Sequence, residues 1–354
     1  MVMEGQGGCQ NVPALILIFQ LHPSATGLSV ALIVLKSPRD PSQAPINRMI
    51  IDQVLGQLAQ DTLVNFAAPL FALAIVIEIG LSRQLQRHLY SAADTLTSFA
   101  MLVFSAIAEF LPKILAFMAF YALHEISPLR DLVGRQWWAW VTLFFLDDFT
   151  YYWFHRANHE VRVFWAGHVP HHSSVRLNLG TALRQGVGER LHKFLFWLWL
   201  PLLGFDALMI FTMISLNLIY QFWVHTQLVR RLPAPIELIF NTPSHHRVHH
   251  ASNLTYLDRN HAGVLVIWDR LFGTFAAERD DEPPVYGLTH HVESRNPLTV
   301  ATHEYAALWR DCRRATTWRD RLRYLCLAPG WCHDGEDRRA SVLRRLRTDA
   351  KPLT

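Results

Sequence analysis

The sequence predicts an all-α membrane protein, a polytopic bundle of about four transmembrane helices. Two observations lead to this fold class: long apolar runs recur along the 354 residues, and few charged residues interrupt them. The hydrophobic fraction is 51% and the charged fraction is 18%, below the roughly 25% of an average soluble domain. About 20 apolar residues span a bilayer core, so repeated runs of this length favour a membrane bundle over the buried helices of a soluble protein.

The four predicted spans are residues 65–81, 97–123, 137–154 and 194–224. The first span carries one charge, Glu78, and the third carries two adjacent carboxylates, Asp147 and Asp148. Carboxylates inside a membrane are costly and usually have partners. The fourth run is the longest, and because Pro201 and Gly204 interrupt it, it is either one kinked helix or a helical hairpin.

The chain divides by composition into three parts, residues 1–48, 49–280 and 281–354. The first part has no basic n-region and no clean cleavage site, so it is either an imperfect extra span or sequence upstream of a true start at Met49. The last part is polar and rich in arginine. We expect it on the cytosolic side, as a solvated face or against anionic headgroups, rather than as a nucleic-acid-binding arm.

Histidine is the residue type that points to chemistry, with 19 copies. Eight of them form three clusters, HxxxH, HxxHH and HxxHH: His155, His159; His168, His171, His172; and His246, His249, His250. Residues three or four apart lie on one face of a helix, so each cluster presents its imidazoles to one side. Because one ion takes about four to six ligands, eight imidazoles predict a site for two metal ions, carried by a helical cap beyond the spans.

The type of ligand narrows the choice of metal. Imidazole suits iron and zinc, and manganese or copper less well, whereas calcium and magnesium prefer oxygen. The four cysteines show no paired spacing, so we expect neither a disulfide framework nor a thiolate zinc site: Cys9, Cys312, Cys326 and Cys332.

Further residues near the clusters are candidates for the site. His225, at the end of the fourth run, is predicted to be an additional ligand, and His261 is a weaker candidate ligand. A metal-bound histidine usually donates its other N–H to a carboxylate or carbonyl, which makes Asp148 and Glu160 candidate partners of the ligands. Asn260 is a third candidate for such a supporting role. Pairing with a nearby arginine is the alternative for the carboxylates.

The order of the clusters and their flanks resembles the fatty acid hydroxylase/sterol desaturase superfamily of membrane di-iron enzymes, and within it the alkylglycerol monooxygenase-like branch. The motifs that carry this resemblance are residues 148–156 (DFTYYWFHR), 165–174 (WAGHVPHHSS), 241–250 (NTPSHHRVHH), 268–275 (WDRLFGTF) and 329–331 (PGW). The resemblance covers roughly residues 60–335 and makes residues 49–280 a membrane catalytic domain of this type.

The resemblance implies an integral, multi-pass membrane oxidoreductase with two irons per chain on the cytosolic side, held by the eight cluster histidines. His225 also matches a recurrent histidine of the family, whereas His261 stands where many relatives carry tyrosine. The implied reaction uses O₂ to hydroxylate an aliphatic C–H of a lipid, with an ether lipid as one candidate. The electrons come from outside, from a tetrahydropterin or an electron-transfer protein, because the chain has no flavin, haem-attachment or Rossmann motif.

Three alternatives stay open at this point. Desaturation begins with the same hydrogen abstraction as hydroxylation, so the residues do not separate the two reactions. A sterol or carotenoid desaturase or hydroxylase is the alternative within enzymes. A histidine-rich membrane protein that binds or transports metal is the alternative of another class, although a transporter should place its ligands in mid-span, and these clusters lie at and beyond the span ends.

Overall fold

The computed structural model describes residues 15–21, 28–34, 62–290, 292 and 294–349. The chain forms two compact units, Met1–Asn65 and Phe66–Thr354. Within the first unit, strands β1 (Leu15–Leu21) and β2 (Leu28–Val34) pair antiparallel, with Leu15 opposite Val34. Met49 and most of the predicted N-terminal extension lie outside the described residues.

The described part of the second unit is helical, apart from three isolated β-bridges. Its elements are α2 (Thr62–Gln84, which begins at the unit boundary), α3 (Ala92–Glu125), α4 (Arg130–Val133), α5 (Trp137–Glu160), α6 (Arg162–His172), η1 (Leu179–Leu183), α7 (Glu189–His192), η2 (Lys193–Trp197), α8 (Trp199–Leu202), α9 (Ala207–Trp223), α10 (Ala234–Ile239), α11 (Pro243–His249), α12 (Ile267–Leu271), α13 (Pro297–Arg314), α14 (Trp318–Cys326) and α15 (Ala340–Asp349).

Two helices among the described residues, α2 and α3, are long and apolar enough to cross a membrane. They match the first two predicted spans. Large apolar side chains on them are exposed, such as Phe66 at 74% and Ile107 at 71%, which suits contact with lipid rather than water. The helical fold class is therefore confirmed for this unit, whereas the predicted number of four spans is not.

The third and fourth predicted spans differ from the first two. Helix α5 has 24 residues, and its Asp147 and Asp148 are buried in the protein interior. The fourth run is divided into η2, α8 and the 17-residue α9. Gly204 lies in the turn between α8 and α9. Its φ is +91°, and a Cβ at this position would lie 2.6 Å from the Leu129 carbonyl oxygen, so only glycine fits this turn.

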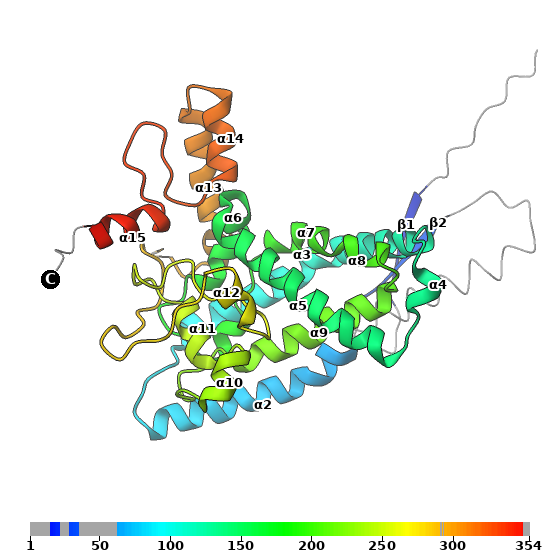
Figure 1. Cartoon of the computed structure of the whole chain (residues 1–354), viewed down its shortest axis with the longest axis horizontal. Coiled ribbons are helices and arrows are strands. Elements are labelled where there is room, and N and C mark those ends of the chain that lie inside the picture. The colour runs from blue at the N-terminus through cyan, green and yellow to red at the C-terminus, as the bar shows by residue number, and fades with distance from the viewer. Residues whose placement is uncertain (1–14, 22–27, 35–61, 291, 293, 350–354) are drawn as a thin grey trace, which may run out of the picture. The chain divides into compact units, whose positions relative to one another are not determined.

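The main hydrophobic core lies where α3, α5 and α9 pack together with η2 and α8. Figure 1 shows α2, α5 and α9 running alongside one another, with α10, α11 and α12 at one end of these helices. The most deeply buried side chains are aromatic or large and aliphatic: Phe120, Leu143, Phe154, Trp197, Leu200, Met209 and Ile210. The Phe154 ring meets the Trp197 ring edge to face at 5.4 Å, a geometry that aromatic pairs prefer.

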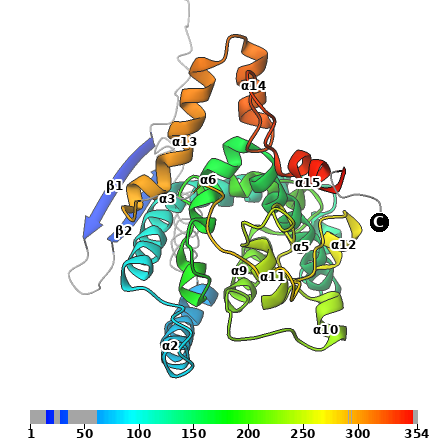
Figure 2. The same ribbon diagram turned by 90° about the vertical axis from the view of Figure 1, so that its left-hand side faces the viewer.

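The arginine-rich C-terminal part packs on this bundle. Helices α13 and α14 form a hairpin that contacts α6 and projects away from the other helices (Figure 2). Val300 of α13 is buried against Met101 of α3. Arg162 of α6 forms ion pairs with Glu304 at 2.8 Å and Asp311 at 2.7 Å.

Glu78 connects α2 to the part of the protein that holds the predicted ligands. Its carboxylate is buried and accepts hydrogen bonds from the Tyr90 hydroxyl, the Leu179 backbone N–H at 2.8 Å and the Thr226 hydroxyl. Thr226 directly follows His225. A buried carboxylate with several donors is a strong local constraint, because each donor left unpaired costs about 1–3 kcal/mol.

We expect Glu78→Ala to lower the free energy of unfolding by about 3 kcal/mol or more, because three buried donors lose their acceptor. Thermal unfolding of the detergent-solubilised protein measures the effect. The matched control is Glu125→Ala, whose carboxylate forms an exposed ion pair with Arg130 and should change stability by less than about 1 kcal/mol. Equal effects of the two substitutions would contradict the structural role of Glu78.

Candidate metal centre

The three predicted histidine clusters all lie on helices at one end of the bundle. His155 and His159 are in the last turns of α5, the second cluster is in α6, and the third is in α11. Proline at position 243 begins α11, a position where its missing N–H costs nothing. His225 follows the end of α9 by two residues.

Nine buried histidines form two groups with converging ring nitrogens. We call the first the five-histidine subsite and the second the four-histidine subsite. Within each group, one ring nitrogen per residue lies within 4.8 Å of every other. The five-histidine subsite contains His155, His159, His168, His172 and His249, and the four-histidine subsite contains His171, His225, His246 and His250.

The helical period explains this division. On α6, His168 and His172 are four residues apart and share a subsite, whereas His171 belongs to the other. Helix α11 does the reverse: His246 and His250 belong to the four-histidine subsite and His249 to the five-histidine subsite. Adjacent residues on a helix point about 100° apart, so each HxxHH motif supplies both subsites. The subsites therefore adjoin, and the His172 and His250 rings stack at 4.4 Å.

The ring nitrogens approach one another closely. Nε2 of His168 lies 3.2 Å from Nε2 of His155 and 3.1 Å from Nε2 of His172. In the other subsite, Nε2 of His225 lies 3.2 Å from that of His171 and 2.9 Å from that of His246. Without a cation, each such contact needs a proton between two nitrogens, and one proton cannot serve two contacts. A cation at each focus would accept all of these lone pairs.

Unpartnered nitrogens support the same conclusion. Among the described residues, Nε2 of His159, Nε2 of His249 and Nδ1 of His246 are buried and make no hydrogen bond. Leaving a buried polar nitrogen unpaired costs about 1–3 kcal/mol. Since Nε2 of His159 and of His249 belongs to rings of the five-histidine subsite, the donor set fits a metal ion there.

Eight of the nine histidines have a lowered pKa, which favours the neutral form that a ligand needs. Burial, reinforced by neighbouring histidines, lowers the pKa of His155, His171, His172, His246, His249 and His250 well below the usual range. Burial also lowers the pKa of His159, and that of His225 to about 4. Neutral imidazoles present a lone pair to a cation at neutral pH.

Hydrogen bonds at Nδ1 orient most of the rings. Backbone carbonyls accept from Nδ1 in four cases: His155 to His261 (2.9 Å), His171 to Arg184 (3.1 Å), His225 to Gln221 (2.8 Å) and His249 to Arg259 (3.0 Å). Carboxylates face Nδ1 of two further histidines: a Glu189 oxygen lies 2.6 Å from Nδ1 of His168, and an Asp258 oxygen lies 3.5 Å from Nδ1 of His159. Such outer partners leave Nε2 free for the metal. Both of these histidines are members of the five-histidine subsite.

Glu189 is a functional residue that the sequence did not predict, because no motif spacing connects it to His168. Although burial raises the pKa of Glu189, charge interactions with His168 and Arg190 outweigh burial and hold it below its usual range. The backbone at Glu189 approaches α6 closely: a Cβ on Gly167 would lie 2.6 Å from its N atom. Glycine at position 167 therefore allows Glu189 to reach His168.

The three predicted supporting residues bond to groups other than the histidine rings. Asp148 accepts from the backbone N–H groups of Val264 (2.7 Å) and Leu265 (2.9 Å) and from the Trp268 indole (2.9 Å). Glu160 forms an ion pair with Arg156 at 2.9 Å. The Asn260 side chain donates to the carbonyls of His245 and Ala276. Asp148 and Asn260 thus position the backbone around the site. Glu160 has the alternative role, because it pairs with an arginine rather than with a histidine.

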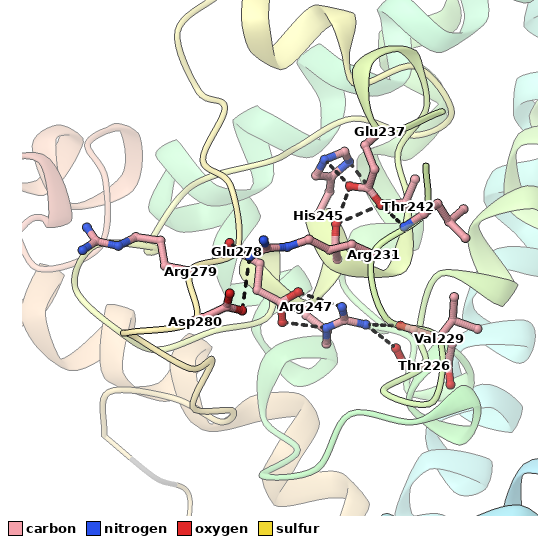
Figure 3. Close-up of polar contacts among 12 residues, drawn as sticks. Thr226, Val229, Arg231, Glu237, Thr242, His245, Arg247, Glu278, Arg279 and Asp280 are labelled. Atoms are coloured by element: carbon pink, nitrogen blue, oxygen red, sulfur yellow. Dashed lines mark hydrogen bonds and ion pairs between the residues drawn. The ribbon is translucent and has the colours of Figure 1, made fainter. Parts of the chain in front are cut away.

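A second polar cluster, shown in Figure 3, supports α11 from its other side. His245 points to Glu237, with 3.0 Å between Nε2 and the carboxylate, and belongs to neither subsite. Arg247 pairs with Glu278 through two hydrogen bonds of 2.8 and 2.7 Å and also donates to the carbonyls of Thr226 and Val229. It therefore connects the helix that carries three ligands to the segment after His225.

His261, the remaining predicted ligand, lies beside the five-histidine subsite. Its side chain is fully buried, and its ring centroid is 5.0 Å from that of His159. Its nitrogens belong to neither converging group.

A third group with metal-binding atoms lies in the C-terminal part: Cys332, His333 and Asp334. These residues are partly exposed, and they bond to one another and to the Tyr324 hydroxyl. Their polar atoms therefore already have partners, unlike those of the two buried subsites.

Nine buried imidazoles that converge on two adjoining foci at the end of an apolar helical bundle are compatible with a histidine-ligated site for metal ions. Comparison with known proteins places these histidines in a family of lipid-modifying enzymes. Residues 140–274 match the fatty acid hydroxylase family, and they include all nine converging histidines. The chain is similar to this family over the part that carries the histidines.

Named relatives define the branch. The chain is 38% identical to the alkylglycerol monooxygenase of Homo sapiens over 270 residues, which cover 76% of this chain and 60% of the relative. The Danio rerio protein of the same name is also 38% identical over 270 residues, covering 76% and 59%. Ornithine lipid hydroxylase OlsE of Rhizobium tropici is 34% identical over 131 residues, covering 37% and 39%. The chain thus spans about 60% of the length of its alkylglycerol monooxygenase relatives. No solved structure matches.

We expect Glu189→Gln to weaken metal binding by about 10- to 100-fold, because the amide removes the carboxylate behind His168. Titration with a competing chelator measures the affinity. The matched control is Glu160→Gln, since Glu160 pairs with Arg156 at the surface and touches no ligand. An affinity for the Glu189 variant equal to that of the control would show that this carboxylate does not support the metal centre.

Proposed function

We propose that this chain is a membrane-bound oxygenase that holds two iron ions and uses O₂ and external electrons to hydroxylate an aliphatic C–H bond of a lipid. The observation that carries the proposal is the convergence of nine buried histidines on two foci. Similarity to the fatty acid hydroxylase family, whose named relatives include monooxygenases and a lipid hydroxylase, supports it.

The donor set suits iron. Both subsites consist of imidazoles, without a thiolate or carboxylate among their described converging atoms, and imidazole suits iron, zinc and copper. Zinc has no redox chemistry, whereas iron and copper do. We propose iron because the sequence motifs resemble those of membrane di-iron enzymes. When bound, the two ions would supply the activation of O₂ that attack on an unactivated C–H bond requires.

The residues of this chain would hold and shield that chemistry. All nine proposed ligands are at least nine-tenths buried, so the centre is shielded from bulk solvent. Trp165 covers one side, with its ring 5.1 Å from that of His159 and 5.6 Å from that of His172. Glu189 and the backbone carbonyls at Nδ1 keep the rings in one tautomer.

The substrate class follows from the relatives and from the surface. Alkylglycerols are ether lipids, and the exposed apolar side chains of α2 and α3 suit a protein that takes its substrate from a bilayer. Hydroxylation next to the ether oxygen converts R–CH₂–O–R′ into R–CH(OH)–O–R′, with the second oxygen atom, two electrons and two protons forming water. This hemiacetal breaks into an aldehyde and an alcohol.

The remaining parts of the proposal concern placement and electrons. We propose a multi-pass protein with its metal centre and C-terminal part on the cytosolic side, in line with the arginine content of residues 303–347. The two electrons come from a tetrahydropterin or an electron-transfer protein. Residues Asp148 and Asn260 position the backbone of the centre, as their hydrogen bonds indicate.

Metal content is the first test. We expect detergent-purified protein from cells grown with labelled iron to hold two coupled irons per chain by Mössbauer spectroscopy. The double variant His171→Ala/His172→Ala removes one ligand from each subsite and should lose most of this iron. His303→Ala is the control, because His303 bonds only to a backbone carbonyl of α13. Freshly isolated, active protein that contains zinc alone would rule out the di-iron proposal.

Activity is the second test. With a 1-O-alkylglycerol, O₂ and reduced tetrahydropterin, we expect O₂ uptake and formation of a fatty aldehyde, and a loss of at least about 100-fold in the double histidine variant. The matched substrate is the ester-linked monoacylglycerol of the same chain length, which lacks the ether CH₂ and should give no aldehyde. An alkene product would instead indicate desaturation, and turnover of sterols or carotenoids alone would replace the ether-lipid proposal.

A further inference from the structure

His261 is a buried base that the two subsites leave unexplained. Its side chain has 0% exposure, and neither Nδ1 nor Nε2 makes a hydrogen bond. Among the described histidines it is the one whose two ring nitrogens are both buried and unpaired. The backbone carbonyl of Asp258 is near enough to the ring to oppose the lowering of its pKa by burial, but it does not meet either ring nitrogen in hydrogen-bond geometry. Such a ring normally costs stability unless a ligand pairs with it.

The ring is held in this position by several independent contacts. Asp269 accepts the backbone N–H groups of His261 (2.8 Å) and Ala262 (2.9 Å). Asn260 adopts the left-handed φ of +57°, and its backbone N–H donates to the Thr274 carbonyl at 3.1 Å. The carbonyl of His261 itself accepts from Nδ1 of His155. These hydrogen bonds fix the backbone of the loop, so the unpaired imidazole of His261 is held in one position.

His261 lies beside the direct ligands but outside their converging group. Its ring centroid is 5.0 Å from that of His159 and 5.9 Å from those of His155 and His249. The centroids of His155 and His159, two members of the five-histidine subsite, are themselves 5.3 Å apart, so the ring is near enough to act on the same subsite. The His261 nitrogens also fall outside the group whose atoms all lie within 4.8 Å. Five imidazoles are already present there, which nearly completes the coordination of one ion.

We propose that His261 is a binding residue for a small exchangeable ligand of the five-histidine subsite, a water or hydroxide, to which its ring nitrogen hydrogen-bonds. This inference rests on the proposed function, because it needs a metal at that subsite. A neutral imidazole can donate or accept a hydrogen bond, so it suits a ligand that changes its protonation. His261 thus determines which small ligands the subsite retains, whereas the nine converging histidines retain the metal.

The test compares metal content with binding of a probe anion, azide, to the oxidised, metal-loaded protein. His261→Phe keeps a ring of similar size and removes both nitrogens, and His261→Gln keeps a hydrogen-bonding group. We expect both variants to keep the wild-type metal content. The azide dissociation constant, followed by its charge-transfer absorption, should rise about five- to tenfold in the Phe variant, as for one lost hydrogen bond, and less in the Gln variant.

The matched control is His303→Phe on α13, which should change neither quantity. Thermal unfolding of the metal-free proteins shows whether each variant folds. If the Phe variant does not fold, the azide affinity and metal content of the Gln variant alone test the proposal. Loss of about one metal per chain from the His261 variants would overturn the proposal in favour of a direct ligand. Unchanged metal and unchanged azide affinity would overturn it outright. Absence of metal from the wild-type protein would instead refute the proposed function, and this inference with it.

Discussion

The burial of nine imidazoles in one volume is the constraint on which the rest of this structure depends. Removing so many polar rings from water is favourable only if their lone pairs meet a cation and their Nδ1–H groups meet acceptors. Four separate segments supply the rings, α5, α6, the end of α9 and α11. Each segment must therefore be held in a fixed place, and the buried carboxylates of the bundle do this. Asp148 holds residues 264–268, Asp269 holds residues 261 and 262, and Glu78 holds the segment after His225.

The two subsites differ in their surroundings. The five-histidine subsite is backed by Glu189 and Asp258, whereas the described partners of the four-histidine subsite at Nδ1 are backbone carbonyls. A carboxylate at Nδ1 makes the imidazole a stronger donor to a metal than a carbonyl does. His261 and Trp165 also lie on the side of the five-histidine subsite. The protein therefore offers two chemically distinct positions, which suits a reaction in which the two ions have unequal roles.

The position of the centre relative to the apolar helices fits the proposed lipid substrate. Helices α2 and α3 expose apolar side chains along their length, and Glu78 of α2 bonds to η1 and to Thr226, close to ligands of the four-histidine subsite. The arginine-rich α13 packs on α6 through Arg162, so the polar C-terminal part contacts a helix that carries three ligands. The exposed apolar helices and the converging histidines thus belong to one packed unit rather than to two independent parts.

The sequence by itself determined the helical class, the first two apolar helices and the clustering of eight histidines, because hydrophobic length and the helical period are local properties of the chain. It also indicated His225. Only the tertiary structure decided the division into five and four ligands, the partnership of Glu189 with His168, and the different partners of Asp148, Glu160 and Asn260. It also decided that the fourth apolar run breaks at Gly204. These features depend on which distant segments meet, and contacts between residues far apart in the chain leave no periodic signal in the sequence.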